Sequence, residues 1–270
     1  MFLSNLHTHT THSDGTAVPE KYVLAALERG FVSIGFSEHM PTCYQCVCEM
    51  HEDDIPRYIA EIAALKEKYR NHIEILLGIE YDVYSPVKRG DLGLDFTIGS
   101  VHYLKTHDGN YISVDYTPKI FEDLVRKFGG VREVSLEYYR LLCEVIESRP
   151  DILGHFDLLT KFNSGKRFFD PDEAWYRKIV DDVIDIVAQS GIIVEVNTGA
   201  MSRGHRKTPY PSEYILRELY LNGVPVTISA DAHSPNTIDF AFRETEAFLR
   251  RVGYKSVKMY RNGGFADMPI

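Results

Sequence analysis

The sequence predicts an α/β barrel built from seven parallel strands. Seven short apolar runs, rich in Val, Ile and Phe, alternate with longer segments of helical period, and this alternation is typical of a parallel sheet. The number of runs, and the lack of a glycine-rich dinucleotide loop, favour a barrel over an open doubly wound sheet. The length of 270 residues suits one such domain, because barrels of roughly 250 residues are common. We therefore expect a single domain over residues 1–270.

The predicted strands are short, β-branched or aromatic runs, several of them bounded by Gly or Pro. They cover Phe2–Leu6, Val32–Phe36, Ile73–Ile79, Phe96–Val101, Ile152–Phe156, Ile192–Val196 and Val224–Ser229. Helices are expected between them, with proline in the first turn or glycine after the last. Their expected extents are Pro19–Gly30, Ile55–Leu65, Pro171–Gly191, Pro211–Gly223 and a segment within Ile238–Gly253.

The regular alternation is interrupted at residues 103–150, between the fourth and fifth strands. The sequence His107-Asp108-Gly109-Asn110 predicts a turn. Helical segments are expected near Lys119–Phe128 and Glu133–Glu147. We interpret the stretch as a long excursion that partly covers the barrel mouth, which favours a small substrate.

The charge balance excludes several kinds of partner. With 30 Lys plus Arg against 39 Asp plus Glu, the formal net charge is −9, which argues against a non-specific nucleic-acid or anionic-membrane surface. No run approaches the ~18 apolar residues of a membrane span, and the first residues do not resemble a signal peptide. We therefore expect a cytoplasmic protein whose four cysteines are thiols or ligands rather than disulfides. The oligomeric state is left open.

Side chains that can bind metal follow six of the seven predicted strands. In chain order they are His7, His9 and His12, then Glu38 and His39, Glu80, His102, His155 with Asp157, and Asp231 with His233. Because all strand C-termini of a β/α barrel meet on one face, these side chains would converge. A single histidine at a strand end is usually structural, but chance placement of seven of the 11 histidines there is hard to defend. Mixed imidazole and carboxylate donors predict a site for Zn, Mn or Fe.

These side chains lie in short motifs spread from His7 to His233. The motifs are HTHTTHSDG at His7–Gly15, Glu38-His39, Gly78-Ile79-Glu80, Gly99-Ser100-Val101-His102, Gly154-His155-Phe156-Asp157 and Ser229-Ala230-Asp231-Ala232-His233. In combination they resemble the PHP (polymerase and histidinol phosphatase) family. The motif spacing and the 103–150 excursion are most similar to those of the stand-alone histidinol-phosphate phosphatases of histidine biosynthesis.

The resemblance implies a distorted (β/α)7 TIM-like barrel with three divalent metal ions, which could be Zn, Mn or Fe. By motif position, the first ion would be held by His7, His9, Glu80 and Asp231. The second would share Glu80 as a bridging ligand with His102 and His155. The third would be held by His12, His39 and His233. All nine positions carry the expected residue, so we do not expect a degenerate, inactive copy.

The implied activity is hydrolysis of a phosphomonoester, L-histidinol phosphate, to L-histidinol and phosphate. A metal-bridging hydroxide would attack phosphorus directly. Glu80 and Asp231 are the candidate catalytic residues, with Asp231 or a water as the proton donor to the leaving group. Three divalent ions would outweigh these negative charges, so an acidic protein could still bind a phosphate dianion.

Residues beyond the fifth and sixth strands are candidates for substrate binding, although solvated loops would show the same composition. Arg203 and Lys161, and less strongly His205 and Arg206, could clamp the phosphate. Asn197 could line the pocket. Two carboxylates, Glu38 and Asp115, could each contact the substrate amine. Asp157 could orient a ligand imidazole.

Cysteines cluster after the second predicted strand, in the pattern Cys43-x2-Cys46-x-Cys48-x2-His51. Three thiols and an imidazole could form a tetrahedral zinc site. The spacing is short and has no second paired half, so we favour an ordinary loop that borders the active mouth. Cys143 lies on an apolar helix face and is expected in the core.

Three other functions stay open. The chain could be a PHP-type phosphatase for phosphotyrosine protein, nucleotide or another small phosphate. It could be a metal-dependent nuclease, although that predicts a basic approach surface. A non-enzymatic metal-binding scaffold is disfavoured, because every expected ligand position is intact.

Overall fold

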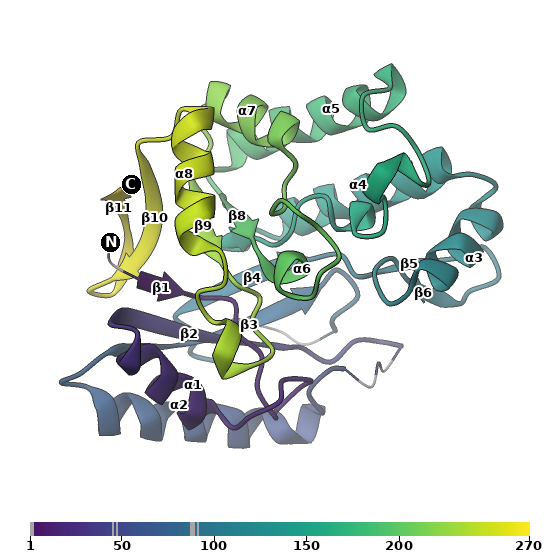
Figure 1. The fold of residues 1–270 in the computed structure, drawn as a ribbon. Helices are drawn as coiled ribbons and strands as arrows, with labels where there is room; N and C mark the ends of the chain where they lie inside the picture. Colours follow the sequence, from purple (N-terminus) through teal and green to yellow (C-terminus); the bar gives the residue numbers. More distant parts are fainter. Residues whose placement is uncertain (1–2, 45, 47, 87–89, 91) are drawn as a thin grey trace.

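Seven parallel strands form the centre of the molecule in a computed structural model that describes residues 3–44, 46, 48–86, 90 and 92–270. The strand order β1-β2-β3-β4-β7-β8-β9 follows the chain around the sheet (Figure 1). The strands are β1 (Leu3–Asn5), β2 (Phe31–His39), β3 (Glu74–Asp82), β4 (Phe96–Ser100), β7 (Ile152–Leu153), β8 (Ile193–Asn197) and β9 (Val226–Ser229). Phe2, which the sequence assigns to the first strand, lies outside the described residues.

The sheet closes almost completely on itself. Thr8, just beyond β1, forms a parallel bridge with Ala232, just beyond β9. The His9 amide donates to the Ala232 carbonyl at 2.9 Å, and the Ala232 amide donates to the His7 carbonyl at 3.0 Å. The contact lies beyond the ends of both strands, so the barrel is closed at its C-terminal end. The predicted seven-stranded barrel is confirmed.

Helices cover the outside of the barrel and follow the predicted pattern. α1 and α2 lie on one side, while α5 and α7 lie on the other (Figure 1). The helices outside the 103–150 stretch are α1 (Pro19–Glu28), α2 (Ile55–Tyr69), α5 (Ala174–Ser190), α6 (Gly199–Ser202), α7 (Glu213–Leu221) and α8 (Phe242–Val252). Within the described chain, we find no helix with the length and apolar character needed to cross a bilayer.

Residues 103–150 form a small hairpin and two helices. Strands β5 (Tyr103–Lys105) and β6 (Tyr111–Ser113) pair antiparallel around the expected turn, where Gly109 takes a φ of 85°. α3 (Pro118–Phe128) and α4 (Val131–Glu147) follow. The Thr117 side chain caps α3 by accepting from the Ile120 amide at 3.2 Å. This stretch leaves the C-terminal end of β4 and leads into the start of β7. Four of its residues border the main cavity: Tyr103, Ser113, Asp115 and Tyr116.

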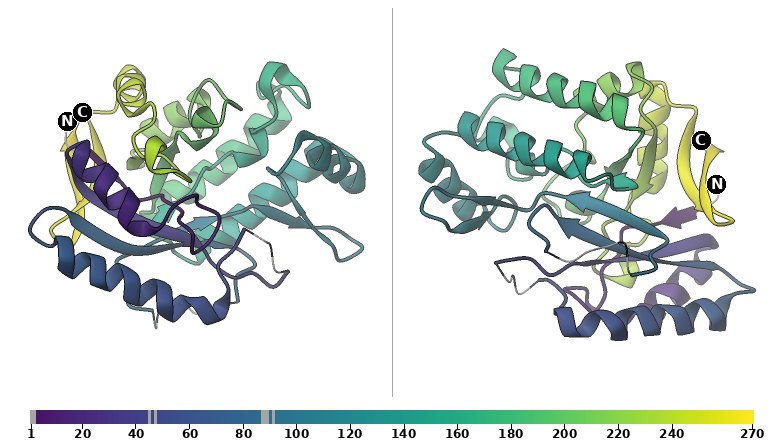
Figure 2. Two further views of the ribbon diagram at one scale, coloured as in Figure 1. Left: turned by 60° about the horizontal axis from the view of Figure 1, so that its bottom comes forward. Right: turned by 180° about the vertical axis from the view of Figure 1, so that it is seen from behind.

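A C-terminal hairpin, absent from the sequence-based expectation, seals the other end of the barrel. Strands β10 (Ser256–Arg261) and β11 (Gly264–Pro269) pair antiparallel, beside the chain termini and opposite β5 and β6 (Figures 1 and 2). Tyr260 joins an apolar cluster with Leu6, Leu76, Phe96, Ile98, Ile152 and Ile193, and Phe265 packs against it. The dipeptide Asn262-Gly263 forms the turn, with both φ angles positive. Asn-Gly is a strong hairpin signal from which this turn could have been predicted.

Candidate metal centre

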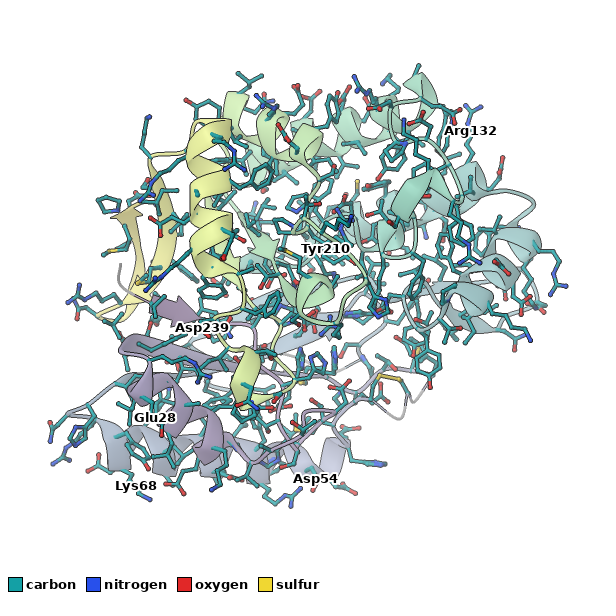
Figure 3. The ribbon with its side chains drawn as sticks, in the orientation of Figure 1. Glu28, Asp54, Lys68, Arg132, Tyr210 and Asp239 are labelled. Atoms are coloured by element: carbon teal, nitrogen blue, oxygen red, sulfur yellow. A yellow bond between two sulfur atoms is a disulfide. The ribbon has the colours of Figure 1, made fainter. Side chains whose placement is uncertain are left out.

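Imidazoles and carboxylates from six strands converge at the C-terminal end of the barrel, among the side chains drawn in Figure 3. His7 and His9 follow β1, His39 ends β2, Glu80 lies in β3, His102 follows β4, His155 follows β7, and Asp231 and His233 follow β9. Several of them line a cavity of about 310 Å³. Parallel strands thus bring together residues more than two hundred positions apart, as expected for the catalytic face of a β/α barrel.

Glu80 lies at the centre of this cluster. Its Oε2 is 3.2 Å from His7 Nε2, 3.5 Å from His9 Nε2 and 3.0 Å from His39 Nδ1. Its Oε1 is 3.0 Å from His155 Nε2 and 3.4 Å from His102 Nε2. One buried carboxylate therefore faces five imidazoles. This arrangement suits a ligand shared between two ions, the bridging role predicted for Glu80.

Asp231, which follows β9, faces two of the same imidazoles. Its Oδ1 lies 3.4 Å from His9 Nε2 and 3.7 Å from His7 Nε2. The backbone φ of Asp231 is 47°, a left-handed conformation that is uncommon for non-glycine residues and often marks functional sites. Asp231 thus presents its carboxylate to the site from an uncommon backbone conformation.

One predicted ligand, His12, lies apart from the described donor groups. The Nε2 of His12 lies 2.8 Å from Glu61 Oε2 on α2. Asp14 lies beside the cluster instead, with its Oδ1 3.2 Å from His233 Nε2 and 3.8 Å from His39 Nε2. Both residues belong to the loop after β1, and the path of that loop turns Asp14 inward.

The donor atoms of these side chains fit metal ions. Three groups each bring their donor atoms within 4.8 Å of one another: His9, Asp14, His39 and His233; His7, His9 and Glu80; His39, Glu80 and His102. Among the described residues, His7 Nε2, His9 Nε2 and Glu80 Oε2 are buried without a hydrogen-bond partner. Unpaired buried polar atoms are costly, and a cation between them would satisfy them. The residues present therefore fit a polynuclear metal centre with the donors preferred by Zn, Mn and Fe.

The electrostatics of the cluster keep two of its donors, His9 and Glu80, in metal-binding form. Burial, reinforced by His39 and His233, lowers the pKa of His9 to about 3, so this imidazole is neutral near pH 7. Burial alone would raise the pKa of Glu80, but His7, His102 and His39 lower it well below its ordinary value. The carboxylate is therefore ionised, as a metal ligand must be.

Glu195 is a buried residue of this region that the sequence analysis missed. Its Oε1 lies 2.5 Å from His7 Nδ1, and its Oε2 accepts from the His155 amide at 2.9 Å. Although burial disfavours the imidazolium, Glu195 and the two site carboxylates raise the pKa of His7 well above its ordinary value. Glu195 orients His7 so that its Nε2 faces the cluster. A charged residue inside the apolar run Ile192–Val196 was the signal that could have identified it.

Asp82, two residues after Glu80, supports His102 in a similar way. Its Oδ2 accepts from the His102 amide at 2.7 Å and lies 3.5 Å from His102 Nδ1. The other ring nitrogen, Nε2, then faces Glu80. The alternation of side chains along β3 places both carboxylates on one face of the strand, and this pattern could have predicted the role of Asp82.

Two predicted substrate-binding residues, Glu38 and Asn197, are not among the residues that line the main cavity. Glu38 is fully buried and accepts from the Thr10 amide at 3.0 Å, the Thr10 hydroxyl at 2.6 Å and the Ser13 hydroxyl. Asn197 is also fully buried, and its side chain bonds Glu195 and the Gly199 amide. Both side chains are therefore engaged in buried hydrogen bonds away from the main cavity.

Two predicted cationic residues, Lys161 and Arg203, do line the cavity. Arg203 donates to Asp231 Oδ2 at 2.9 Å and to the Asp231 carbonyl at 3.2 Å. Lys161 Nζ donates to Asp115 Oδ2 at 2.9 Å, and Asp115 lines the cavity as well. The structure therefore places two cations at the edge of the metal-binding cluster.

His205, Arg206 and Asp157 lie away from this cavity, contrary to expectation. They line a separate cavity of about 240 Å³. Asp157 contacts no ligand imidazole among the described residues; it accepts from the Ser212 amide at 3.2 Å. The loop after β8 turns back at Gly204, where φ is 75°. Arg203 lines the main cavity, whereas Arg206 lines the separate one.

The cysteines differ from the expectation of free thiols. Cys46 and Cys48 form a disulfide with a Cα–Cα distance of 5.3 Å, within the range that a disulfide requires, and both line the main cavity. Cys43 is an exposed thiol. The separate zinc site is not formed, since no donor group found in the described chain includes these cysteines. Cys143 is half-buried and packs against the core.

Comparison with known proteins identifies the family. A model of the PHP domain matches residues 5–199. A probable histidinol-phosphatase of Deinococcus radiodurans is 30% identical over 267 residues, which cover 94% of this chain and 95% of that protein. The fold is similar to a crystal structure of a putative histidinol phosphatase from Listeria monocytogenes, with a TM-score of 0.79, 21% identity and coverage of 90% of this chain and 99% of that one.

A second crystal structure, of histidinol phosphate phosphatase from Lactococcus lactis in complex with zinc, L-histidinol and phosphate, is also similar. Its TM-score is 0.71 at 20% identity, with 97% of this chain and 98% of that chain covered. The match of the family model to more than half of the chain, and the relative from Deinococcus radiodurans over nearly its full length, agree with the motifs. The chain belongs to the PHP domain family.

Proposed function

We propose that this chain is a metal-dependent phosphomonoester hydrolase that converts L-histidinol phosphate to L-histidinol and phosphate. The observation that carries the proposal is one cavity of about 310 Å³. Lys161 and Arg203 line it together with most of the metal-binding cluster, namely Asp14, His39, Glu80, His102, His155, Asp231 and His233. The histidinol-phosphatase name of the relative from Deinococcus radiodurans supports this substrate. So do the L-histidinol and phosphate bound in the Lactococcus lactis structure.

We assign the ligands to three sets, guided by the motif positions and the distances between donor atoms. His7, His9, Glu80 and Asp231 would hold one ion, and Glu80, His102 and His155 a second. Asp14, His39 and His233 would hold a third, with His9 beside them. Asp14 thus replaces His12 in the set implied by the family resemblance. Bound divalent ions would supply an activated water as nucleophile and neutralise the phosphate oxygens.

The chain's own residues would bind and orient the phosphate. Arg203 and Lys161 present guanidinium and ammonium donors to the cavity, and such donors bind phosphate oxygens strongly. Arg203 also holds Asp231 Oδ2, which leaves Asp231 Oδ1 directed at His7 and His9. The side chains that surround the cluster exclude bulk water, since His7, His9 and Glu80 are almost completely buried.

The rest of the cavity wall suits a small, positively charged alcohol. Three tyrosines, Tyr44, Tyr103 and Tyr116, line it together with the carboxylates Glu49, Asp82 and Asp115. Aromatic faces and carboxylates attract a cation, such as the amine of L-histidinol. The same carboxylates would repel the additional phosphates of a nucleic acid. We therefore propose a small cytoplasmic metabolite as substrate, with no nucleic-acid partner.

The proposal is tested by comparing kcat/KM over a panel of phosphate esters, using protein purified with added Mn or Zn. Histidinol phosphate should give about 10⁴ M⁻¹s⁻¹ or more, well above phosphotyrosine peptide, nucleoside monophosphates and p-nitrophenyl phosphate. The matched control is imidazolylpropyl phosphate, which lacks only the amine and should be a poorer substrate. Equal, weak turnover of every ester would agree with phosphatase chemistry but would refute the proposal that histidinol phosphate is the substrate.

Replacing Arg203 by Ala should raise KM for histidinol phosphate by about tenfold or more, because a hydrogen bond to a charged group contributes about 1.5–3 kcal/mol. Steady-state kinetics measure the change. Arg243→Ala, which removes an exposed arginine from α8, is the control and should leave KM unaltered. An unchanged KM in Arg203→Ala would remove this residue from the phosphate site.

A further inference from the structure

Lys161 and Arg203 stand on loops rather than on strands. Lys161 follows the short 3-10 helix Leu158–Thr160 after β7. Arg203 follows the four-residue helix α6 after β8. Short helical turns of this kind are not rigid on their own. The distance between the two cations therefore depends on the side-chain contacts that connect the two loops.

Arg206 makes that connection through its guanidinium group. It donates to the Thr160 hydroxyl on the first loop, and to the Thr208 and Pro209 carbonyls, both at 3.3 Å, on the second. The guanidinium also stacks 4.3 Å from the centre of the Tyr210 ring, which lies in the loop before α7 (Figure 3). Only 12% of the Arg206 side chain is exposed, so this is a largely buried cross-link.

Asp157 lies beside both Arg206 and Thr160 and supports the same connection. It is fully buried, and its Oδ2 accepts from the Ser212 amide at 3.2 Å. That oxygen lies 3.9 Å from Arg206 NH1 and 3.4 Å from the Thr160 hydroxyl. A buried carboxylate beside a buried guanidinium avoids the cost of isolating either charge.

The cross-link reaches both cations through the backbone. Thr160 immediately precedes Lys161. The Arg206 amide donates to the Ala200 carbonyl within α6 at 3.2 Å, and α6 leads directly into Arg203. Arg206 itself faces the separate cavity of about 240 Å³, so its effect on the main cavity must pass through these neighbours.

We propose that Arg206, braced by Asp157, is a positioning residue that sets the separation of Lys161 and Arg203 for phosphate binding without touching the substrate. The inference rests on the proposed function, because it assumes that these two cations bind the phosphate group. A planar guanidinium is needed here, since it must reach a hydroxyl and two carbonyls while it stacks on a ring.

Arg206→Gln and Arg206→Lys test the proposal, with Lys207→Gln as the matched control. Arg206→Gln should raise KM for histidinol phosphate, and Ki for inorganic phosphate, by about tenfold, with kcat within about threefold of the parent. Arg206→Lys keeps the positive charge but lacks the planar guanidinium group. KM and Ki should therefore rise less than in Arg206→Gln but stay above the parent values. Lys207→Gln removes the neighbouring exposed cation and should change neither constant. Unchanged KM and Ki in Arg206→Gln would overturn the proposal.

Double mutants separate a positioning role from direct binding or a general loss of stability. In the Arg203→Ala and Lys161→Ala backgrounds, the effect of Arg206→Gln on Ki should shrink, because one of the cations that it positions is already absent. A full tenfold effect in both backgrounds would contradict the proposal. If Arg206→Gln fails to fold, Asp157→Asn gives the same readout, with a smaller rise in Ki expected.

The reporter reaction keeps this test distinct from that of the proposed function. Ki for inorganic phosphate can be measured with p-nitrophenyl phosphate as substrate. If the wild-type enzyme does not hydrolyse histidinol phosphate, the proposed substrate is refuted. The Ki values of the variants for inorganic phosphate would still show whether Arg206 acts on the phosphate site.

Discussion

Replacing Glu80 by Gln is expected to lower kcat/KM by about a thousandfold or more, equivalent to a loss of roughly 4 kcal/mol of transition-state stabilisation. The reason is its central position, since one buried carboxylate faces five imidazoles. An amide has the same shape but no charge, and its NH₂ group cannot bind a cation. Bound metal should therefore fall together with the activity, as measured by elemental analysis of the purified variant.

The control for this prediction lies at the other end of the same strand. Glu74 begins β3 and accepts from the amides of Asn262 and Gly263 in the C-terminal hairpin. Glu74→Gln keeps an acceptor oxygen there, so metal content and kcat/KM should stay near the parent values. Full metal occupancy with near-normal activity in Glu80→Gln would show that this carboxylate is not a ligand.

Asp14→Asn is expected to lower kcat/KM by about a hundredfold, the upper part of the range for losing a residue that supports metal binding, and to release one equivalent of metal. His12→Gln should retain all the metal and lose less than about tenfold in activity. The difference follows from the geometry, because Asp14 Oδ1 faces His39 and His233, whereas His12 Nε2 faces Glu61. Kinetics and elemental analysis of the two variants decide between these residues. Loss of metal in His12→Gln with full occupancy in Asp14→Asn would restore the ligand set implied by the family motifs.

The alternation of strands and helices predicted the barrel because each parallel strand is a short apolar run that must be covered by a helix. Once the barrel is assumed, residues at strand ends such as Glu80, His102 and His155 are brought to one face by topology alone. For these residues no detail of loop conformation is needed, and the structure places them where the sequence predicted.

The loop after β1 could not be predicted in the same way. His12 and Asp14 are two residues apart, and the loop path decides which of them faces inward. That path depends on Glu38, which binds Thr10 and Ser13 from a different strand. It also depends on Gly15, where an added Cβ would lie 2.1 Å from the His9 carbonyl oxygen. Such long-range contacts leave no local pattern in the sequence.

Like the path of the loop after β1, the partners of buried polar residues could not be predicted from the sequence. Glu195 lies within an apolar run, and periodicity assigns such a run to the core without identifying the polar partner that its carboxylate needs. Arg206 looked like a candidate phosphate ligand because it is a cation in a loop near the active face. The structure instead places it on the Thr160 and Tyr210 side of that loop. The direction of a side chain in a loop depends on tertiary contacts, whereas the position of a residue at a strand end follows from the barrel topology.

The central claim is that the side chains at the C-terminal face form a polynuclear metal centre that hydrolyses a phosphate ester. Its most direct test is to remove all metal with a chelator, return Mn or Zn in measured equivalents, and follow both bound metal and histidinol phosphate hydrolysis. A polynuclear metal centre should give less than about 1% activity without metal and a maximum only after more than one equivalent is bound. Full activity in the metal-free protein, or with a single bound ion, would contradict this claim.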